Sequence, residues 1–191
     1  MMDIILASAS PRRKELLEQI GLRVRVIPSH ISEEEPNGID FAAHVREMAK
    51  AKARKIAANH PDILVLGADT LVICDDHPMG KPKDRNDAVI MLTRLSGTCH
   101  EVISGICLIR LSQDIEITDY ARTVVHFFPL SAEEIDDYIQ SGEPFDKAGA
   151  YGIQGLGARF VKEIRGCFFN VVGLPLGMVW QHIKSFPEGN R

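Results

Sequence analysis

The feature of this sequence that most limits its fold is a strand that leads directly into a helix. Residues Asp3 to Ser8 (DIILAS) form a short apolar run that is typical of a buried strand. Ser10 is a preferred N-cap residue, and Pro11 suits the first helical position because its fixed φ matches the helix. The sequence therefore begins with a strand, a tight turn and a helix start, an arrangement that is common in α/β folds.

Two arginines follow in the first turn of this predicted helix. The N–H groups of Arg12, Arg13 and their neighbours carry about half a positive charge there, so each cation costs about 0.3–1 kcal/mol unless an anion lies nearby. Arginine also binds phosphate through parallel hydrogen bonds. The helix start, together with Ser8 in the preceding turn, therefore predicts a phosphate-binding site.

The remaining sequence alternates strands and helices at first and then contains a long hairpin. The predicted helices cover residues 11–20, 40–59, 84 or 86 to 96, 131–142 and 174–185. The predicted strands cover 3–8, 23–28, 62–66, 71–74, two paired strands within 100–128, 159–164 and 168–172. A glycine-rich loop is predicted at 142–157, and no repeat or linker divides the chain. We therefore expect one α/β domain over 1–191, with a mixed sheet and flanking helices.

The composition excludes several classes of protein. Nowhere do about 18 apolar residues follow one another, and the N-terminus lacks the pattern of a signal peptide. The net charge of −4 and the absence of a basic block argue against a nucleic-acid polymer as partner. The four cysteines form no CxxC pair and are expected to be buried thiols. These observations predict a cytoplasmic protein without membrane or nucleic-acid partners.

Lys52 lies within the apolar stripe of the predicted helix 40–59. At about 100° per residue, Val45, Ala49 and Ile56 share its face. One interpretation is a side chain whose stem packs on apolar neighbours while its ammonium reaches water. The other is an ammonium held toward an internal anion.

Asp69 interrupts the otherwise apolar run VLGADTLVI. An unpaired buried carboxylate is costly, so Asp69 is expected to have a cation, a metal or several donors as partners. It either caps backbone N–H groups at a strand break or faces a ligand at the end of a buried strand, where α/β sheets place their sites.

Three further residues have chemical capacity but weak local signals. Glu33 belongs to an acidic loop that either is solvated or supplies a ligand to a hard metal. Lys81 lies in a Gly-Lys-Pro turn of a kind that is common on surfaces. Gln154 lies among glycines, which either make a tight connection or let its amide read a base edge.

Several short segments occur in one order along the chain: LASASPRRKELL (6–17), MAKAKA (48–53), LGADTLV (66–72), GKP (80–82), LSG (95–97), GEPFDKAGAYGIQG (142–155) and NVVGLPL (170–176). In this order and spacing they resemble the Maf family of nucleoside triphosphate pyrophosphatases, nearly from end to end. The resemblance implies two lobes around a cleft, similar to inosine triphosphate pyrophosphatases. It also implies hydrolysis between the α and β phosphates that depends on a divalent metal, Mg²⁺ or Mn²⁺, and a homodimer.

The resemblance also assigns roles to residues. Asp69 matches the family's proton acceptor, and Arg12, Thr70 and Gln154 match positions tied to substrate choice. YGIQG with Gln154 is similar to the branch that acts on dTTP and UTP, whereas the 7-methyl-GTP branch carries a glutamate there. The remaining polar residues of the family's cleft are matched by Arg13, Glu33, Lys52 and Lys81.

The resulting hypothesis is a pyrophosphatase for dTTP, UTP and modified pyrimidine nucleotides. Its catalytic residues are Asp69, Lys52 and Lys81, and its metal ligands are Glu33 and Asp69. Its substrate-binding residues are Ser8, Arg12, Arg13, Thr70 and Gln154. Two alternatives stay open: a nucleotide-binding regulator of cell division with little turnover, and another phosphoryl-transfer enzyme.

Overall fold

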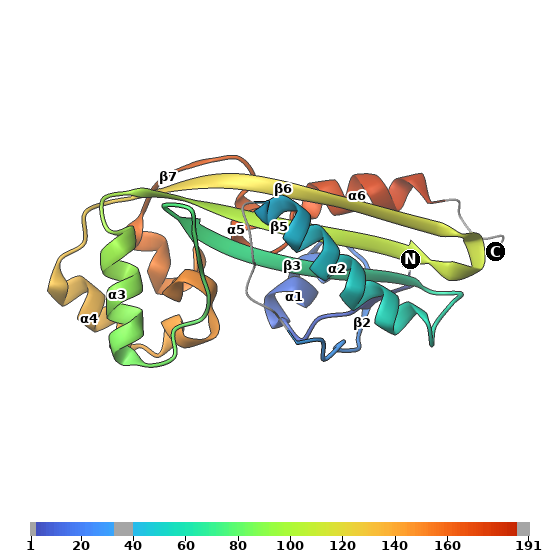
Figure 1. The fold of residues 1–191 in the computed structure, drawn as a ribbon, viewed down its shortest axis with the longest axis horizontal. Helices are drawn as coiled ribbons and strands as arrows, with labels where there is room; N and C mark the ends of the chain where they lie inside the picture. Colours follow the sequence, from blue (N-terminus) through green and yellow to red (C-terminus); the bar gives the residue numbers. More distant parts are fainter. Residues whose placement is uncertain (1–2, 33–39, 187–191) are drawn as a thin grey trace.

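The computed structural model describes residues 3–32 and 40–186, and its centre is a mixed sheet (Figure 1). In this part of the chain the sheet has seven strands in the order β2-β1-β3-β5-β6-β7, with β4 paired to β3 outside this path. The strands are β1 (Asp3–Leu6), β2 (Arg23–Val26), β3 (Leu64–Cys74), β4 (His77–Met79), β5 (Cys99–Arg110), β6 (Ile115–Phe127) and β7 (Val161–Arg165). β1 runs parallel to β2 and β3, whereas the other pairings are antiparallel.

Six helices surround this sheet in the described residues: α1 (Pro11–Gln19), α2 (Phe41–Ala57), α3 (Arg85–Leu95), α4 (Ala132–Gln140), α5 (Phe168–Val172) and α6 (Leu176–Ser185). Side chains cap three of them. Asp40 and Asp84 each accept a backbone N–H of the first turn, and Ser131 forms a capping box with Glu134. The predicted α/β class with a mixed sheet is confirmed.

The predicted strand 168–172 is wrong, because these residues form α5. A five-residue segment with four apolar residues around Asn170 fits a strand or a short helix equally well by pattern alone. Tertiary contacts decide here: the buried amide of Asn170 donates to the carbonyl of Val102 and to Oγ1 of Thr123. Thr123 also bonds the backbone of Cys167 at the start of the helix.

Three smaller expectations also differ. The two strands predicted at 62–66 and 71–74 are one strand, β3, and the glycine-rich loop contains 3₁₀ turns at 143–146, 148–150 and 155–160. Cys99 is exposed because it begins β5 at the surface, although all four thiols are free as expected. None of the helices within the described residues is long and apolar enough to cross a membrane.

Helices cover both faces of the sheet at its β1 end. Ile5, Val65 and Cys107 pack against small residues of α2, whereas Leu66 and Ile106 belong to a cluster with α6. Neighbouring residues of a strand point to opposite faces, so α2 and α6 lie on opposite sides of β3.

A separate core forms at the other end of the long strands β5 and β6. It joins Val102, Val125 and Phe127 with residues of α3, α4 and the segment 148–160. Figure 1 shows α3 and α4 at this end, away from α1, α2 and α6. The molecule therefore has two lobes that share β3, β5 and β6, as expected.

Candidate active site

The sheet has a gap along one edge of β3, and this gap is where the site lies. β5 pairs with β3 from Val65 to Ile73 on one edge, so β1 and β4 must both pair on the other edge. β1 reaches only Leu66, and β4 begins only at Val72. Residues 67–71 therefore have no strand partner on that edge, and their backbone groups there are available to other residues.

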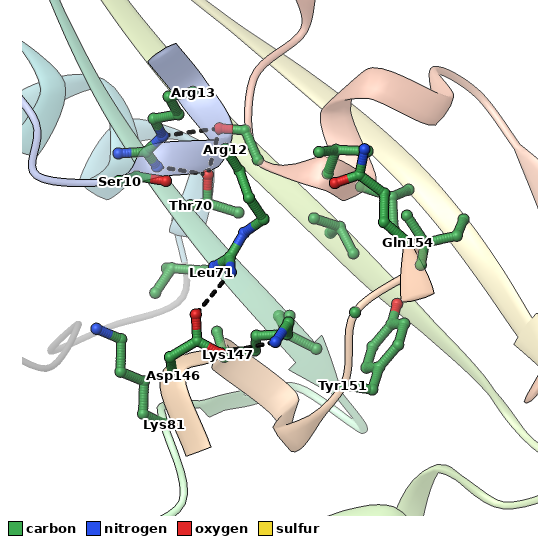
Figure 2. A pocket seen from close by; sticks show the side chains of 18 of the residues that line it. Ser10, Arg12, Arg13, Thr70, Leu71, Lys81, Asp146, Lys147, Tyr151 and Gln154 are labelled. Carbon is green, nitrogen blue, oxygen red and sulfur yellow. Dashed lines mark hydrogen bonds and ion pairs between the residues drawn. The ribbon is translucent and has the colours of Figure 1, made fainter. Parts of the chain in front are cut away.

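A pocket of about 570 Å³ opens at this gap, between the two lobes (Figure 2). Its walls come from the turn before α1, from β3, from the segment after β4, and from the loop after α4. The pocket brings together seven of the predicted site residues: Ser8, Arg12, Arg13, Asp69, Thr70, Lys81 and Gln154. Glu33 lies outside the described residues.

Lys52 lines a second cavity of about 180 Å³, which shares Ser8 with the main pocket. Its ammonium Nζ lies 2.6 Å from Oδ1 of Asp69, and only 5% of Lys52 and 6% of Asp69 is exposed. Lys52 thus points toward an internal anion, as the second of its two interpretations predicts. The anion is the carboxylate of Asp69, which lines the main pocket.

Asp69 lies in the middle of β3, so its predicted position at a strand end is wrong. The reason is that β3 continues beyond β1 to pair with β4 and with the long strand β5. The gap between β1 and β4 nevertheless gives Asp69 the access to a ligand that a strand end would give. Because Thr70 is its neighbour in the strand, the two side chains point to opposite faces.

Two glycines bring α2 close enough for Lys52 to reach Asp69. A Cβ on Gly67 would overlap the backbone of α2 at Ala49, and a Cβ on Gly105 would overlap it at Val45. Gly105 is also the β5 residue that pairs with Asp69. The absence of side chains at these positions therefore sets the distance between α2 and the sheet beside the buried ion pair.

Arg13 replaces the missing strand partner in the gap. Its Nη1 donates to the carbonyl of Ala68 at 2.9 Å and to Oγ of Ser8 at 3.0 Å. Its Nε donates to the carbonyl of Gly173, and its Nη2 donates to Oγ1 of Thr70, both at 2.9 Å. The guanidinium thus joins α1, β3 and the turn after α5, and it lies in the pocket wall with its orientation fixed by these bonds.

Thr70 shares this network. The Thr70 hydroxyl lies 2.8 Å from the hydroxyl of Ser104, a fully buried residue of β5. The Thr70 hydroxyl also donates to the carbonyl of Gly173 at 3.3 Å. Sequence reasoning missed Ser104, because a serine in an apolar strand gives no signal of its partner.

Arg12 reaches across the pocket in the other direction. Its Nη1 donates to Oδ2 of Asp146 at 2.7 Å, while Nζ of Lys147 lies 2.7 Å from Oδ1 of the same carboxylate. Burial raises the pKa of the Asp146 carboxyl, but the hydrogen bonds from Lys147 and Arg12 outweigh this effect and lower the pKa to about 2. Asp146 is therefore ionised at neutral pH.

The loop that carries Gln154 is held by an acidic residue. Glu143 accepts the hydroxyl of Tyr138 and the backbone N–H groups of Leu156 and Gly157. Gln154 itself is exposed and lines the pocket on the side opposite Lys81 (Figure 2). This arrangement suits a ligand that touches both residues at once.

Tyr151 connects the pocket wall to a buried aromatic cluster. Tyr151 lines the pocket, and its hydroxyl lies 2.7 Å from Nε2 of the buried His100. Phe127 meets both rings edge to face. Burial, with a smaller contribution from the charge of His126, lowers the pKa of His100 to about 4, so this histidine is neutral at pH 7.

The described residues offer a metal ion few protein ligands. Within 3–32 and 40–186, no three side chains of His, Cys, Asp or Glu lie together. Mg²⁺ commonly takes one or two carboxylates and completes its shell with substrate phosphates and water. Asp69 presents one carboxylate at the pocket, and its Oδ1 is the oxygen that binds Lys52. This donor set fits a cation that binds together with a phosphate ligand.

Comparisons with known proteins give a consistent result. Residues 3–186 match the family described as Maf-like protein. The chain is 49% identical to a dTTP/UTP pyrophosphatase from Ruminiclostridium cellulolyticum, with 98% of each chain covered. It is 48% identical to a protein of the same name from Clostridioides difficile, over 97% of this chain and 95% of that one.

A solved structure resembles this one more distantly. It is described as a nucleoside-triphosphatase or dITP/XTP pyrophosphatase from Mycobacterium abscessus, is 15% identical, and aligns over 95% of each chain with a TM-score of 0.47.

Proposed function

Because this chain belongs to the Maf family, we propose that it hydrolyses dTTP and UTP, and modified pyrimidine nucleotides of the same shape. The reaction breaks the anhydride between the α and β phosphates and releases a nucleoside monophosphate and pyrophosphate. Its relatives that are 46–50% identical carry the name dTTP/UTP pyrophosphatase, which supports this choice of substrate.

The observation that carries the proposal is the buried pair of Lys52 and Asp69 beside a pocket lined by cationic side chains. A carboxylate is an expensive group to bury, and its oxygen here lies within reach of bound ligand. A buried carboxylate can orient water and accept its proton, whereas a pocket that only binds an anion needs no such group.

The cations supply the affinity for a triphosphate. Micromolar binding corresponds to about −8 kcal/mol, and each charge-assisted hydrogen bond contributes about 1.5–3 kcal/mol. Arg12, Lys81 and the first turn of α1 face the pocket, and Arg13 forms part of its wall. A few such bonds suffice, which explains how a protein of net charge −4 binds a polyanion.

In this mechanism Asp69 orients the attacking water and accepts its proton. Lys52 holds the carboxylate of Asp69 in place, and Arg13 and Lys81 stabilise charge on the departing pyrophosphate, whereas Arg12 contributes to nucleotide binding. Gln154 and Thr70 contact the pyrimidine.

A divalent cation, Mg²⁺ or Mn²⁺, is the cofactor that we propose. Asp69 would hold it together with the phosphates, and Glu33, which lies outside the described residues, would be its second protein ligand. When bound, such an ion neutralises charge on the phosphate oxygens.

The test is a product assay on a panel of nucleotides. The purified protein is incubated with dTTP, UTP, CTP and GTP, with Mg²⁺, with Mn²⁺, or with a chelator. We expect monophosphate and pyrophosphate from dTTP and UTP, much less from CTP and GTP, and no turnover with the chelator. Release of free phosphate would indicate another phosphoryl-transfer enzyme, and binding of dTTP without turnover would indicate a regulator.

We also propose a cytoplasmic location for the protein. Free thiols at all four cysteines are the state kept in a reducing compartment, which supports a cytoplasmic location. A homodimer, which the family resemblance implies, stays a prediction.

A further inference from the structure

A carboxylate lies at the rim of a pocket whose proposed ligand is a polyanion. Asp146 lines this pocket, and 61% of its side chain is exposed. Its charge repels an incoming triphosphate, so another effect of this carboxylate must favour nucleotide binding by more than the repulsion opposes it. The contacts of its two oxygens indicate what that effect is.

One oxygen of Asp146 is fixed from its own side of the pocket. Oδ1 accepts from Nζ of Lys147, which also donates to the carbonyl of Glu143 at 2.5 Å. The stem of Lys147 lies against Gly152, where a Cβ would come within 2.7 Å of Cε. The Lys147 side chain is accordingly only 14% exposed. The carboxylate is therefore held firmly relative to the loop that carries Gln154.

The other oxygen reaches the opposite wall. Oδ2 accepts from Nη1 of Arg12 at 2.7 Å, and the two residues are 134 positions apart in the sequence. Figure 2 shows the Arg12 side chain extended across the pocket toward Asp146. Exposed ion pairs of this kind contribute little to folding stability. The main effect of this pair is therefore on the orientation of the guanidinium.

We propose that Asp146 is a positioning residue that holds Arg12 across the pocket, ready to bind the nucleotide. A long arginine side chain otherwise loses rotamer freedom when its ligand binds, and holding it in advance removes that cost. Arg12 and Lys147 both bind the single carboxylate of Asp146, so these three side chains together keep a net positive charge. This inference rests on the proposed function and adds to it a residue that acts through Arg12 on nucleotide binding, not on the chemical step.

The experiment is a double-mutant cycle read by binding and by kinetics. The variants are Asp146→Asn, Arg12→Gln, the double variant and Asp146→Glu. The measurements are the Kd of α,β-methylene-dTTP, an analogue that cannot be cleaved between these phosphates, and the kcat and KM for dTTP. Asp136→Asn is the matched control, because Asp136 pairs with Arg85 between α3 and α4, outside the pocket lining.

We expect Asp146→Asn to raise Kd and KM by about five- to tenfold while kcat stays within about twofold. Arg12→Gln should raise both by about tenfold or more. Asp146→Asn should add almost nothing when Arg12 is already Gln, since the carboxylate then has no guanidinium to hold. Asp146→Glu should recover part of the affinity, and Asp136→Asn should match the wild type.

Several results would overturn the inference. A lower Kd in Asp146→Asn would mean that the carboxylate only repels the nucleotide. Additive effects of the two substitutions would mean that Asp146 acts without Arg12, and a loss of kcat with unchanged Kd would assign it to the chemical step. If the wild type binds the analogue but releases no pyrophosphate, the proposed function fails while the Kd values still decide this inference. A wild type that binds no nucleotide contradicts both.

Discussion

A lysine and an aspartate that are each more than nine-tenths buried constrain one another strongly. Neither charge can leave for water, so the geometry between Nζ of Lys52 and Oδ1 of Asp69 is set by the fold. A buried pair of this kind is often no more stable than two apolar side chains, but removal of one partner is strongly destabilising. The pair is therefore better explained by the chemistry of Asp69 than by stability.

Asp69→Asn tests that chemistry at the level of one atom. The amide keeps the shape of the carboxylate but accepts no proton from water, so kcat for pyrophosphate release should fall by about 10²–10⁴. The variant should be compared with the wild type at matched folding, checked by circular dichroism. Asp62→Asn, at an exposed carboxylate before β3, should have wild-type activity. Activity of Asp69→Asn within about threefold of the wild type would remove Asp69 from the catalytic role.

Gln154→Glu tests selectivity. A neutral amide presents both a donor and an acceptor, whereas a carboxylate only accepts, so a pyrimidine that both donates and accepts should lose one contact. We expect kcat/KM for dTTP and UTP to fall by about tenfold or more relative to GTP. The same change at Gln113, in the turn between β5 and β6, should leave the ratio unaltered. An unchanged ratio in Gln154→Glu would show that this side chain does not read the base.

At the scale of elements, the position of α2 depends on residues without side chains. Gly67 and Gly105 lie on β3 and β5 under the helix, and a Cβ on either would overlap helix backbone. Helix backbone cannot move aside as the end of a flexible side chain can. The depth of Lys52 in the core is therefore determined by the sheet surface as much as by the helix that carries it.

Gly105→Ala should consequently damage both stability and activity. The added methyl group must push α2 outward beside Asp69, which we expect to cost about 1–3 kcal/mol in the free energy of unfolding. Because the shift lengthens the Lys52–Asp69 contact, kcat should fall as well. Urea denaturation and the pyrophosphate assay measure the two effects.

Gly177→Ala is the control for this substitution. Gly177 lies in α6, where an added Cβ meets no atom within 4 Å, so alanine should raise stability by about 0.5–1 kcal/mol and leave kcat unchanged. A Gly105→Ala variant with the stability and kcat of the wild type would show that α2 has more room than the structure gives it.

For the whole molecule, the sequence predicted what depends on local patterns. Ser10, Asp40 and Ser131 mark helix starts that the structure confirms. The positions of Lys52 and Asp69 in apolar surroundings made a charged partner one of the alternatives for each, and the structure shows that they pair with one another. Each of these signals lies within a few residues of its consequence.

What the sequence could not predict depends on contacts between distant segments. Asp146 lies in the glycine-rich loop, whereas its partner Arg12 lies in the other lobe. The helix at 168–172 depends on the bond from Asn170 to Val102, which no local pattern encodes. The gap in the sheet beside Asp69 depends on where β1 ends relative to β4, and therefore on the register of the whole sheet.

One buried histidine, in the core shared with α3 and α4, contributes to the response of the molecule to acid. Burial lowers the pKa of His100 from 6.5 to about 4, so between these values the unfolded chain holds a proton that the folded chain does not. Stability therefore falls as the pH decreases through this window. This shift of the pKa lowers the free energy of unfolding by about 3 kcal/mol once the pH is below 4.

His100→Gln isolates this contribution, because the amide can still bond the hydroxyl of Tyr151 but does not titrate. The free energy of unfolding, measured with urea between pH 7 and pH 4, should decline less steeply in this variant than in the wild type. His77→Gln, at an exposed histidine of β4, should keep the wild-type slope. Equal slopes in all three proteins would mean that His100 takes up its proton in the folded state without penalty. The aromatic cluster beside the pocket would then be open to water.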